Sequence, residues 1–169
     1  PPVPPRGAAV KGDAVRPRGF LALVLHTHLP FVRHPEHPDF LEERWLFEAI
    51  TETYLPLLER LQRLANDGVP FRLTMSFTPT LLAMLSDGLL RARYERHLER
   101  LIELSAKEIE RTRWTPAFHR LALFYHHRFT TARHLYVDVY RRNLIQAFRE
   151  LADRGVLEPI AFCATHGYL

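Results

Sequence analysis

Cysteine, long apolar runs and a hydrophobic leader are scarce or missing in this 169-residue sequence. Its single cysteine, Cys163, excludes an internal disulfide and fits a reducing compartment. We expect this thiol to be a small buried hydrophobe. No apolar run approaches the roughly 20 residues of a membrane-spanning helix, and residues 1–7 lack the hydrophobic stretch of a signal peptide. We therefore expect a cytoplasmic protein with no membrane partner.

The excess of positive charge is small. The sequence has 23 Lys and Arg against 19 Asp and Glu, a formal net charge of +4. Between residues 99 and 111 the basic side chains alternate with acidic ones, which is typical of solvated, salt-bridged helix faces. A nucleic-acid surface would instead gather Lys and Arg against phosphates, and no nucleic-acid-binding motif is recognisable. We expect no nucleic-acid partner.

Two regions differ in composition. Residues 1–18 are rich in Pro, Gly and Arg without periodicity, so we expect a disordered tail. Residues 19–169 carry the regular apolar patterns of one domain, and the overall apolar content of 47% is enough for a substantial core.

Hydrophobic patterning predicts the elements of this domain. Apolar runs predict buried strands at 20–26 and 157–164, and strict alternation predicts another at 71–77. Helical spacing predicts helices at 42–66, 79–86 and 88–112, and a long helical region, continuous or broken, over 118–153 that Gly155 caps. Pro56 should kink or divide the first helix because it lacks an N–H. Thr78 and Pro79 form a helix start, an N-cap hydroxyl followed by a proline.

The order of these elements is strand, helix, strand, several helices, strand. Such alternation predicts parallel strands joined by right-handed crossovers. Three parallel strands make a poor complete domain, because such a sheet needs both faces covered and its outer strands expose unpaired N–H and C=O groups. We therefore expect an incomplete α/β fold, the opening part of a larger barrel.

Histidines follow two of the predicted strands. His26 and His28 come at the end of the first strand, and His166 follows the last. The carboxyl edge of a parallel sheet is where ligands and chemistry sit. If the strand conformation continued, His26 and His28 would point to the same side. The residues alone leave three interpretations open: structural histidines, metal ligands, or hydrogen-bonding groups for a polar ligand such as a sugar.

A wider set of motifs resembles a known family. These motifs are residues 23–34 (LVLHTHLPFVRH), 45–58 (WLFEAITETYLPLL) and 164–167 (ATHG). Together they resemble glycoside hydrolase family 57, and within it the 1,4-α-glucan branching enzymes. The resemblance runs from about Gly19 to Leu169.

The resemblance implies the N-terminal portion of a (β/α)7 barrel, with parallel strands and crossover helices, that carries out retaining α-1,4 to α-1,6 glucan transglycosylation. It implies an α-1,4-glucan such as amylose or glycogen as substrate, and no metal or other cofactor. His26 and His28 would line the cleft beside the cleaved sugar, and His166 would form hydrogen bonds near the nucleophile. Trp45 would stack on a pyranose face, although a role as core anchor of the helix at 42–66 is an equal alternative.

The resemblance also implies that the catalytic pair is missing. The Glu nucleophile and the Asp acid/base of the family lie beyond Leu169, so we assign no catalytic residue and expect the chain to be inactive by itself. Two other readings remain. One is a metal-dependent hydrolase with a His-x-His site after its first strand, and the other is a non-catalytic glucan-binding remnant. The sequence does not determine the oligomeric state.

Overall fold

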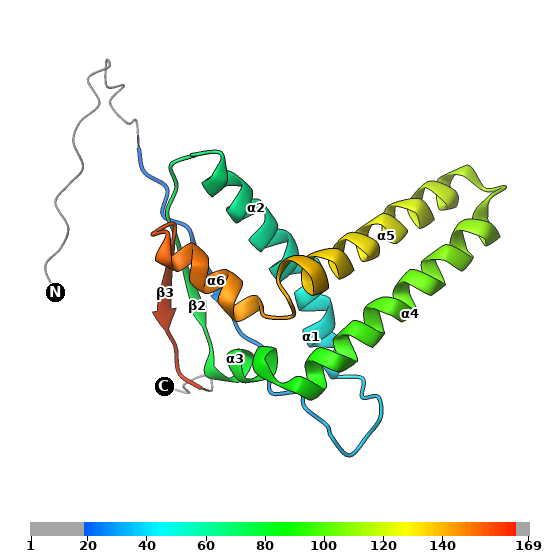
Figure 1. Cartoon of the computed structure of the whole chain (residues 1–169), viewed down its shortest axis with the longest axis horizontal. Helices are drawn as coiled ribbons and strands as arrows, with labels where there is room; N and C mark the ends of the chain where they lie inside the picture. The colour runs from blue at the N-terminus through cyan, green and yellow to red at the C-terminus, as the bar shows by residue number, and fades with distance from the viewer. Residues whose placement is uncertain (1–18, 165–169) are drawn as a thin grey trace, which may run out of the picture.

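The computed structural model describes residues 19–164. Within them, three strands and six α-helices alternate as the sequence predicts (Figure 1). The strands are β1 (Val24–Thr27), β2 (Leu73–Phe77) and β3 (Leu157–Ala161). The helices are α1 (Glu43–Ala49), α2 (Leu55–Asn66), α3 (Pro79–Ser86), α4 (Gly88–Thr112), α5 (Pro116–His134) and α6 (Leu144–Asp153), with π-helical segments η1 (Ile50–Tyr54) and η2 (Leu135–Val139). The expected tail, residues 1–18, and His166 lie outside the described residues.

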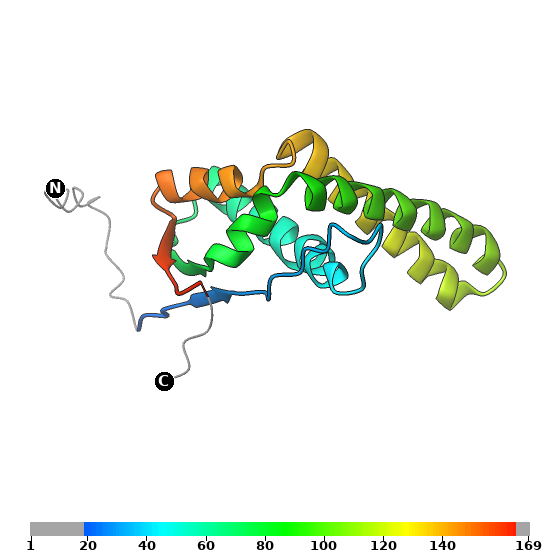
Figure 2. The ribbon, with the colours of Figure 1, turned by 90° about the horizontal axis from the view of Figure 1, so that it is seen from below.

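The strands form one partial sheet in the order β1-β2-β3, and both pairs are parallel. This confirms the α/β class and the parallel connections. The helices lie on one side of this sheet, as Figure 2 shows. On the helix-covered face Met75 is fully buried, whereas Val24 on the opposite face is 61% exposed and Ile160 is 40% exposed.

The first and last strands are shorter and less buried than the sequence predicts. β1 begins at Val24 rather than at residue 20, and Phe20 and Leu21 are 95% and 89% exposed. The pairing register explains this difference, because Val24 already pairs with Thr74, next to the first residue of β2. β3 ends at Ala161, so Cys163 lies beyond the strand and is exposed. The expectation of a buried thiol is therefore wrong.

Pro56 divides the first helical region, as expected. The turn before it widens into η1, where the Leu55 N–H donates to the Ile50 carbonyl five residues back. Pro56 has no N–H to donate, so it takes the N-terminal position of α2, where that donor is not needed.

Local capping fixes the next helices. α3 and α4 have the predicted bounds. The Thr78 hydroxyl accepts from the Leu81 N–H at 3.4 Å, and the Asp87 carboxylate accepts from the Leu90 N–H at 2.9 Å.

The long helical region at 118–153 is broken. α5 runs into η2, and α6 begins only at Leu144 after a turn in which Arg141 and Arg142 have φ angles of 49° and 60°. The predicted cap at Gly155 is confirmed: its φ is 73° and its N–H donates to the Ala152 carbonyl at 2.8 Å.

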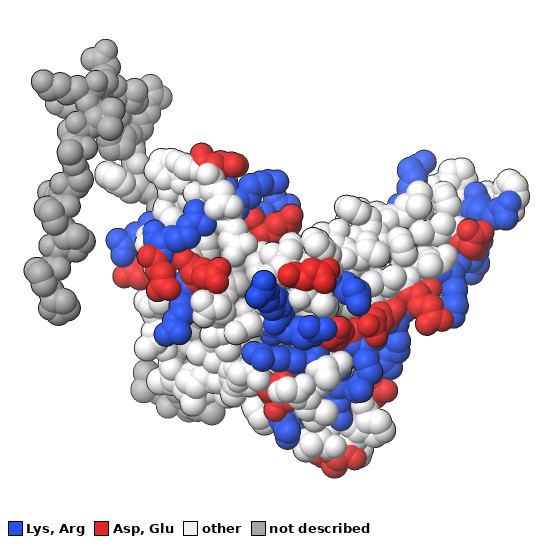
Figure 3. Space-filling view, viewed as in Figure 1, with Lys and Arg blue, Asp and Glu red and all other residues white. Residues whose placement is uncertain are grey.

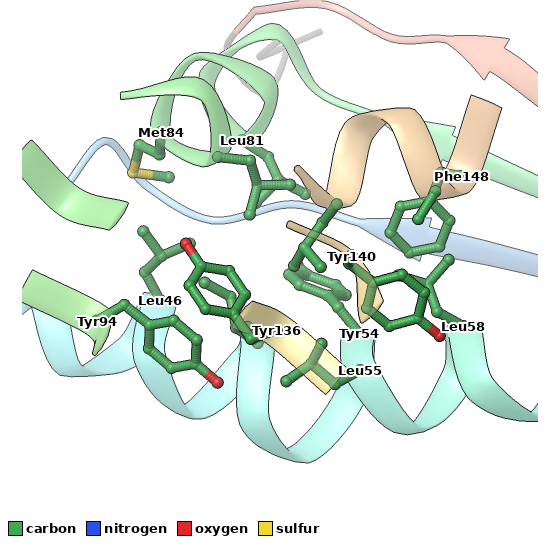
Figure 4. Close-up of a cluster of buried hydrophobic side chains, with 14 of the residues drawn as sticks. Leu46, Tyr54, Leu55, Leu58, Leu81, Met84, Tyr94, Tyr136, Tyr140 and Phe148 are labelled. Carbon is green, nitrogen blue, oxygen red and sulfur yellow. The ribbon is translucent and has the colours of Figure 1, made fainter. Parts of the chain in front are cut away.

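A single apolar core joins the helices to the sheet (Figure 4). One member is Tyr94, which is fully buried and whose ring centroid lies 4.7 Å from that of Tyr136, edge to face. The Tyr94 hydroxyl is 2.9 Å from Thr51 Oγ1 in η1, so one side chain of α4 contacts both π-helical segments. Other members are Leu46, Tyr54, Leu55, Leu58, Leu81, Met84, Tyr140 and Phe148.

α4 and α5 form an antiparallel arm that projects from this core (Figure 1). Basic and acidic side chains alternate along α4, as expected (Figure 3). Examples are Arg111 with Glu108 at 2.7 Å and Lys107 with Glu103 at 2.5 Å. No helix among residues 19–164 has the length and apolar character needed to cross a membrane.

Candidate functional site

His26 lies at the carboxyl end of β1 and contacts Ser76 of β2. The two residues are register partners, and His26 Nδ1 is 2.7 Å from Ser76 Oγ. Ser76 is 2% exposed, whereas His26 is exposed. A buried hydroxyl thus holds the inner nitrogen of an accessible imidazole. The alternating pattern at 71–77 marks Ser76 as a polar strand residue, but the partner strand and its register were not predictable from that pattern.

Thr27 connects Ser76 to β1 a second time. The Thr27 hydroxyl donates to the Ser76 carbonyl, and the Thr27 N–H donates to Ser76 Oγ at 3.4 Å. Ser76 Oγ therefore lies within hydrogen-bonding distance of both the Thr27 N–H and His26 Nδ1.

The His26 and His28 rings lie side by side. Their planes differ by 8° and their centroids are 6.1 Å apart, as the His-x-His spacing predicts. His28 is half-buried, so neither imidazole is sealed inside the core. Two such rings offer a row of hydrogen-bonding nitrogens at one edge of the sheet.

The end of β3 also reaches His26. The Phe162 ring lies 4.7 Å from the His26 ring, tilted by 59°. The segment leaving β3 therefore lies against a residue of β1, and Phe162 is a site residue that the sequence analysis missed. The sequence feature that could have indicated Phe162 is its position four residues before His166. His166 itself lies outside the described residues.

Trp45 lies on α1, at the far end of the loop that follows His28. Its indole is 49% exposed, while the neighbouring Leu46 and Phe47 are 1% and 4% exposed. The core is therefore anchored by Leu46 and Phe47, and the proposed alternative of Trp45 as a core anchor is wrong.

The carboxylates near this edge are engaged elsewhere. Glu43 is 1% exposed and pairs with Arg93, and Asp39 pairs with Arg100 at 3.0 Å. Partial burial of Asp87 raises the pKa of its carboxyl, but hydrogen bonds from the Leu90 N–H and Arg33 outweigh burial and hold the pKa below its usual value. Across residues 19–164, no three His, Cys, Asp or Glu side chains form a group that could hold a metal ion.

A family model and several known proteins match this chain. The family model described as Glycosyl hydrolase family 57 matches residues 22–169. A 1,4-alpha-glucan branching enzyme of Thermococcus kodakarensis is 36% identical over 152 residues, which is 90% of this chain and 22% of that enzyme.

Two solved structures have the same fold. The alpha-amylase AmyC of Thermotoga maritima has 47% identity and a TM-score of 0.77, over 83% of this chain and 26% of the amylase. The GH57-type branching enzyme of Pyrococcus horikoshii has 38% identity and a TM-score of 0.81, over 89% of this chain and 28% of the enzyme. The chain thus spans about a quarter of the length of these relatives. It belongs to glycosyl hydrolase family 57.

Proposed function

We propose that this chain forms the first part of the glucan-binding barrel of a 1,4-α-glucan branching enzyme. The observation that carries the proposal is the pair of parallel imidazoles, 6.1 Å apart, presented at the carboxyl edge of a parallel sheet. The 36% identity to a branching enzyme over 90% of the chain supports the same assignment. The proposed substrate contacts are His26, His28, Trp45 and His166, and the proposed substrate is an α-1,4-glucan.

The proposed role of these residues is to bind and orient sugar. A ring nitrogen of a neutral imidazole can donate to or accept from a hydroxyl of a glucose unit. The half-exposed indole of Trp45 offers an apolar face for a pyranose ring. Holding the sugar in a reactive orientation contributes to the rate without any bond to the reacting atoms.

Bond cleavage is proposed to need carboxylates outside these 169 residues. A retaining mechanism uses two carboxyl groups about 5–5.5 Å apart, one as nucleophile and one as acid/base. Branching then requires that a glucan 6-hydroxyl, rather than water, attack the covalent intermediate. The family resemblance puts both carboxylates after residue 169, so we propose that this chain contributes binding rather than cleavage.

Hydrolysis of α-glucan is the second candidate. The 47% identity to an alpha-amylase over 83% of the chain favours it. The two candidates share the sugar-binding residues and differ only in the acceptor, which is a sugar hydroxyl in branching and water in hydrolysis.

Incubation of the full-length gene product with amylose tests the proposal. Branching predicts new α-1,6 linkages, detected by proton NMR and by debranching, with little gain in reducing ends. A gain in reducing ends without α-1,6 linkages would replace branching with hydrolysis. Tightly bound zinc near one equivalent, with no action on glucan, would overturn both in favour of a metal-dependent hydrolase. The 169-residue chain assayed alone should show neither product.

We also propose a cytoplasmic location and a role in glycogen synthesis. The single cysteine and the branching-enzyme relatives support this placement. Cell fractionation with activity in the extracellular fraction alone would contradict it.

A further inference from the structure

We propose that Arg93 and Glu43 form a positioning pair that fixes the loop between β1 and α1, and through it the separation of His28 and Trp45. This inference rests on the proposed function, because it gives the loop its role at the glucan site. The loop, residues 29–42, starts directly after His28. It ends at α1, whose first residue is Glu43, two positions before Trp45.

One guanidinium holds this loop through its backbone. Arg93, on α4, donates from Nη1 to the His34 carbonyl at 3.1 Å and also to Glu43 Oε1. Its Nη2 donates to the His37 carbonyl. Glu43 Oε1 in turn accepts from the His34 N–H at 3.2 Å. The pair therefore joins α4, the start of α1 and three backbone groups of the loop.

Stability alone is a poor explanation for this pair. The Arg93 and Glu43 side chains are 6% and 1% exposed, and burying two charges carries a desolvation penalty that an apolar pair of similar volume avoids. Moreover, Arg93 Nε is buried with no hydrogen-bond partner among the described residues. An apolar pair would fill the space, but it would leave the His34 and His37 carbonyls unpaired. Fixing those carbonyls requires the planar fork of an arginine.

Two further ion pairs, one half-buried and one exposed, hold the two flanks of the loop. Arg33 pairs with Asp87 at 2.6 Å, and Asp39 pairs with Arg100 at 3.0 Å. The Asp39 pair is more than half exposed on both sides and holds weakly. The buried pair lies between these flanks and acts on the section of backbone from 34 to 37, which neither flanking ion pair contacts.

The test compares three variants of the full-length gene product. The double variant Arg93→Met with Glu43→Leu replaces the pair with apolar side chains. Arg93→Lys keeps a positive charge beside Glu43 but loses the fork. Arg142→Met is the matched control, because Arg142 forms a bidentate pair with Glu95 of α4 at 2.6 and 2.7 Å away from this loop.

Each variant is measured for thermal midpoint, for amide hydrogen exchange at residues 34–41, and for kcat and KM on amylose. In the double variant we expect a near-unchanged midpoint, amide exchange of the His34 N–H about tenfold faster, and kcat/KM about tenfold lower. Arg93→Lys should loosen the loop in the same way, and Arg142→Met should change neither quantity.

An unchanged rate of amide hydrogen exchange at residues 34–41 in the double variant would overturn the inference, whatever the value of kcat/KM on amylose. Faster exchange with unchanged kcat/KM would also overturn it. If Arg93→Lys behaved as the unsubstituted protein, charge alone would hold the loop and the fork would have no role. An unsubstituted protein with no action on glucan would overturn the proposed function instead, and the exchange data would still decide whether the pair fixes the loop.

Discussion

Replacing Ser76 by alanine should weaken the proposed glucan processing chiefly through His26. The substitution removes one buried oxygen atom, which lies 2.7 Å from His26 Nδ1. It leaves the backbone carbonyl of Ser76 in place to accept from the Thr27 hydroxyl, so the β1–β2 pairing stays intact. The expected consequence is an imidazole that keeps its contact with Phe162 but loses the hydrogen bond at Nδ1 and is held less firmly.

The magnitude of the effect on His26 follows from one lost hydrogen bond, although the substitution also removes the longer 3.4 Å contact of the Thr27 N–H. Such a bond contributes about 0.5–1.5 kcal/mol net. If that free energy orients His26 for the reaction, kcat/KM should fall by about two- to tenfold, because each 1.36 kcal/mol corresponds to about a factor of ten. In the 169-residue chain, a loss of about 1 kcal/mol in folding stability would lower the thermal midpoint by roughly 2–4 °C.

The assay is kcat/KM on amylose in the full-length gene product, with Thr74→Ala as the matched control. Thr74 lies two residues earlier on the same face of β2 and pairs with Val24 rather than with a histidine. In a His26→Ala background, Ser76→Ala should have no further effect, since the two residues act as a unit. Equal losses for Ser76→Ala and Thr74→Ala, or full additivity with His26→Ala, would refute the reasoning.

Two further predictions concern stability. Tyr94→Phe removes a buried hydroxyl that is 2.9 Å from Thr51 Oγ1, so the chain should lose about 1 kcal/mol, and an unchanged circular-dichroism melt would contradict this. Burial lowers the pKa of His97 below its ordinary value of 6.5, and Arg100 adds to the effect. As the pH falls below 6.5, the His97 side chain is protonated in the unfolded chain before it is protonated in the folded one. The folding stability present above pH 6.5 therefore decreases until the pH falls below the lower pKa of the folded state. His97→Phe should flatten the fall in urea midpoint between about pH 7.5 and 5.5, and an equally steep fall would exclude this cause.

Local chemistry made much of the helical framework predictable. The hydroxyl of Thr78 followed by Pro79 marks a helix start that depends only on adjacent residues, and α3 begins there. Pro56 and Gly155 act through missing atoms, an N–H and a Cβ, and both interrupt or end helices where expected.

Features that depend on partners were not predictable. The apolar residues 20–23 indicate a strand, but strand pairing starts only where β2 provides a neighbour, at Val24. The turn at Arg141 uses positive φ angles that arginine rarely adopts, so its sequence gives no signal. Similarly, the spacing of His26 and His28 predicted a shared face, whereas the contacts with Ser76 and Phe162 required the fold.

The most direct test of the glucan-binding claim is His26→Ala in the full-length gene product, measured as kcat/KM on amylose. His134→Ala is the control, because His134 is exposed at the end of α5 and pairs with Asp138 at 2.9 Å. The account predicts about a ten- to hundredfold loss for His26→Ala and no change for His134→Ala. Equal and small effects of the two substitutions would contradict the assignment of His26 to the proposed sugar site.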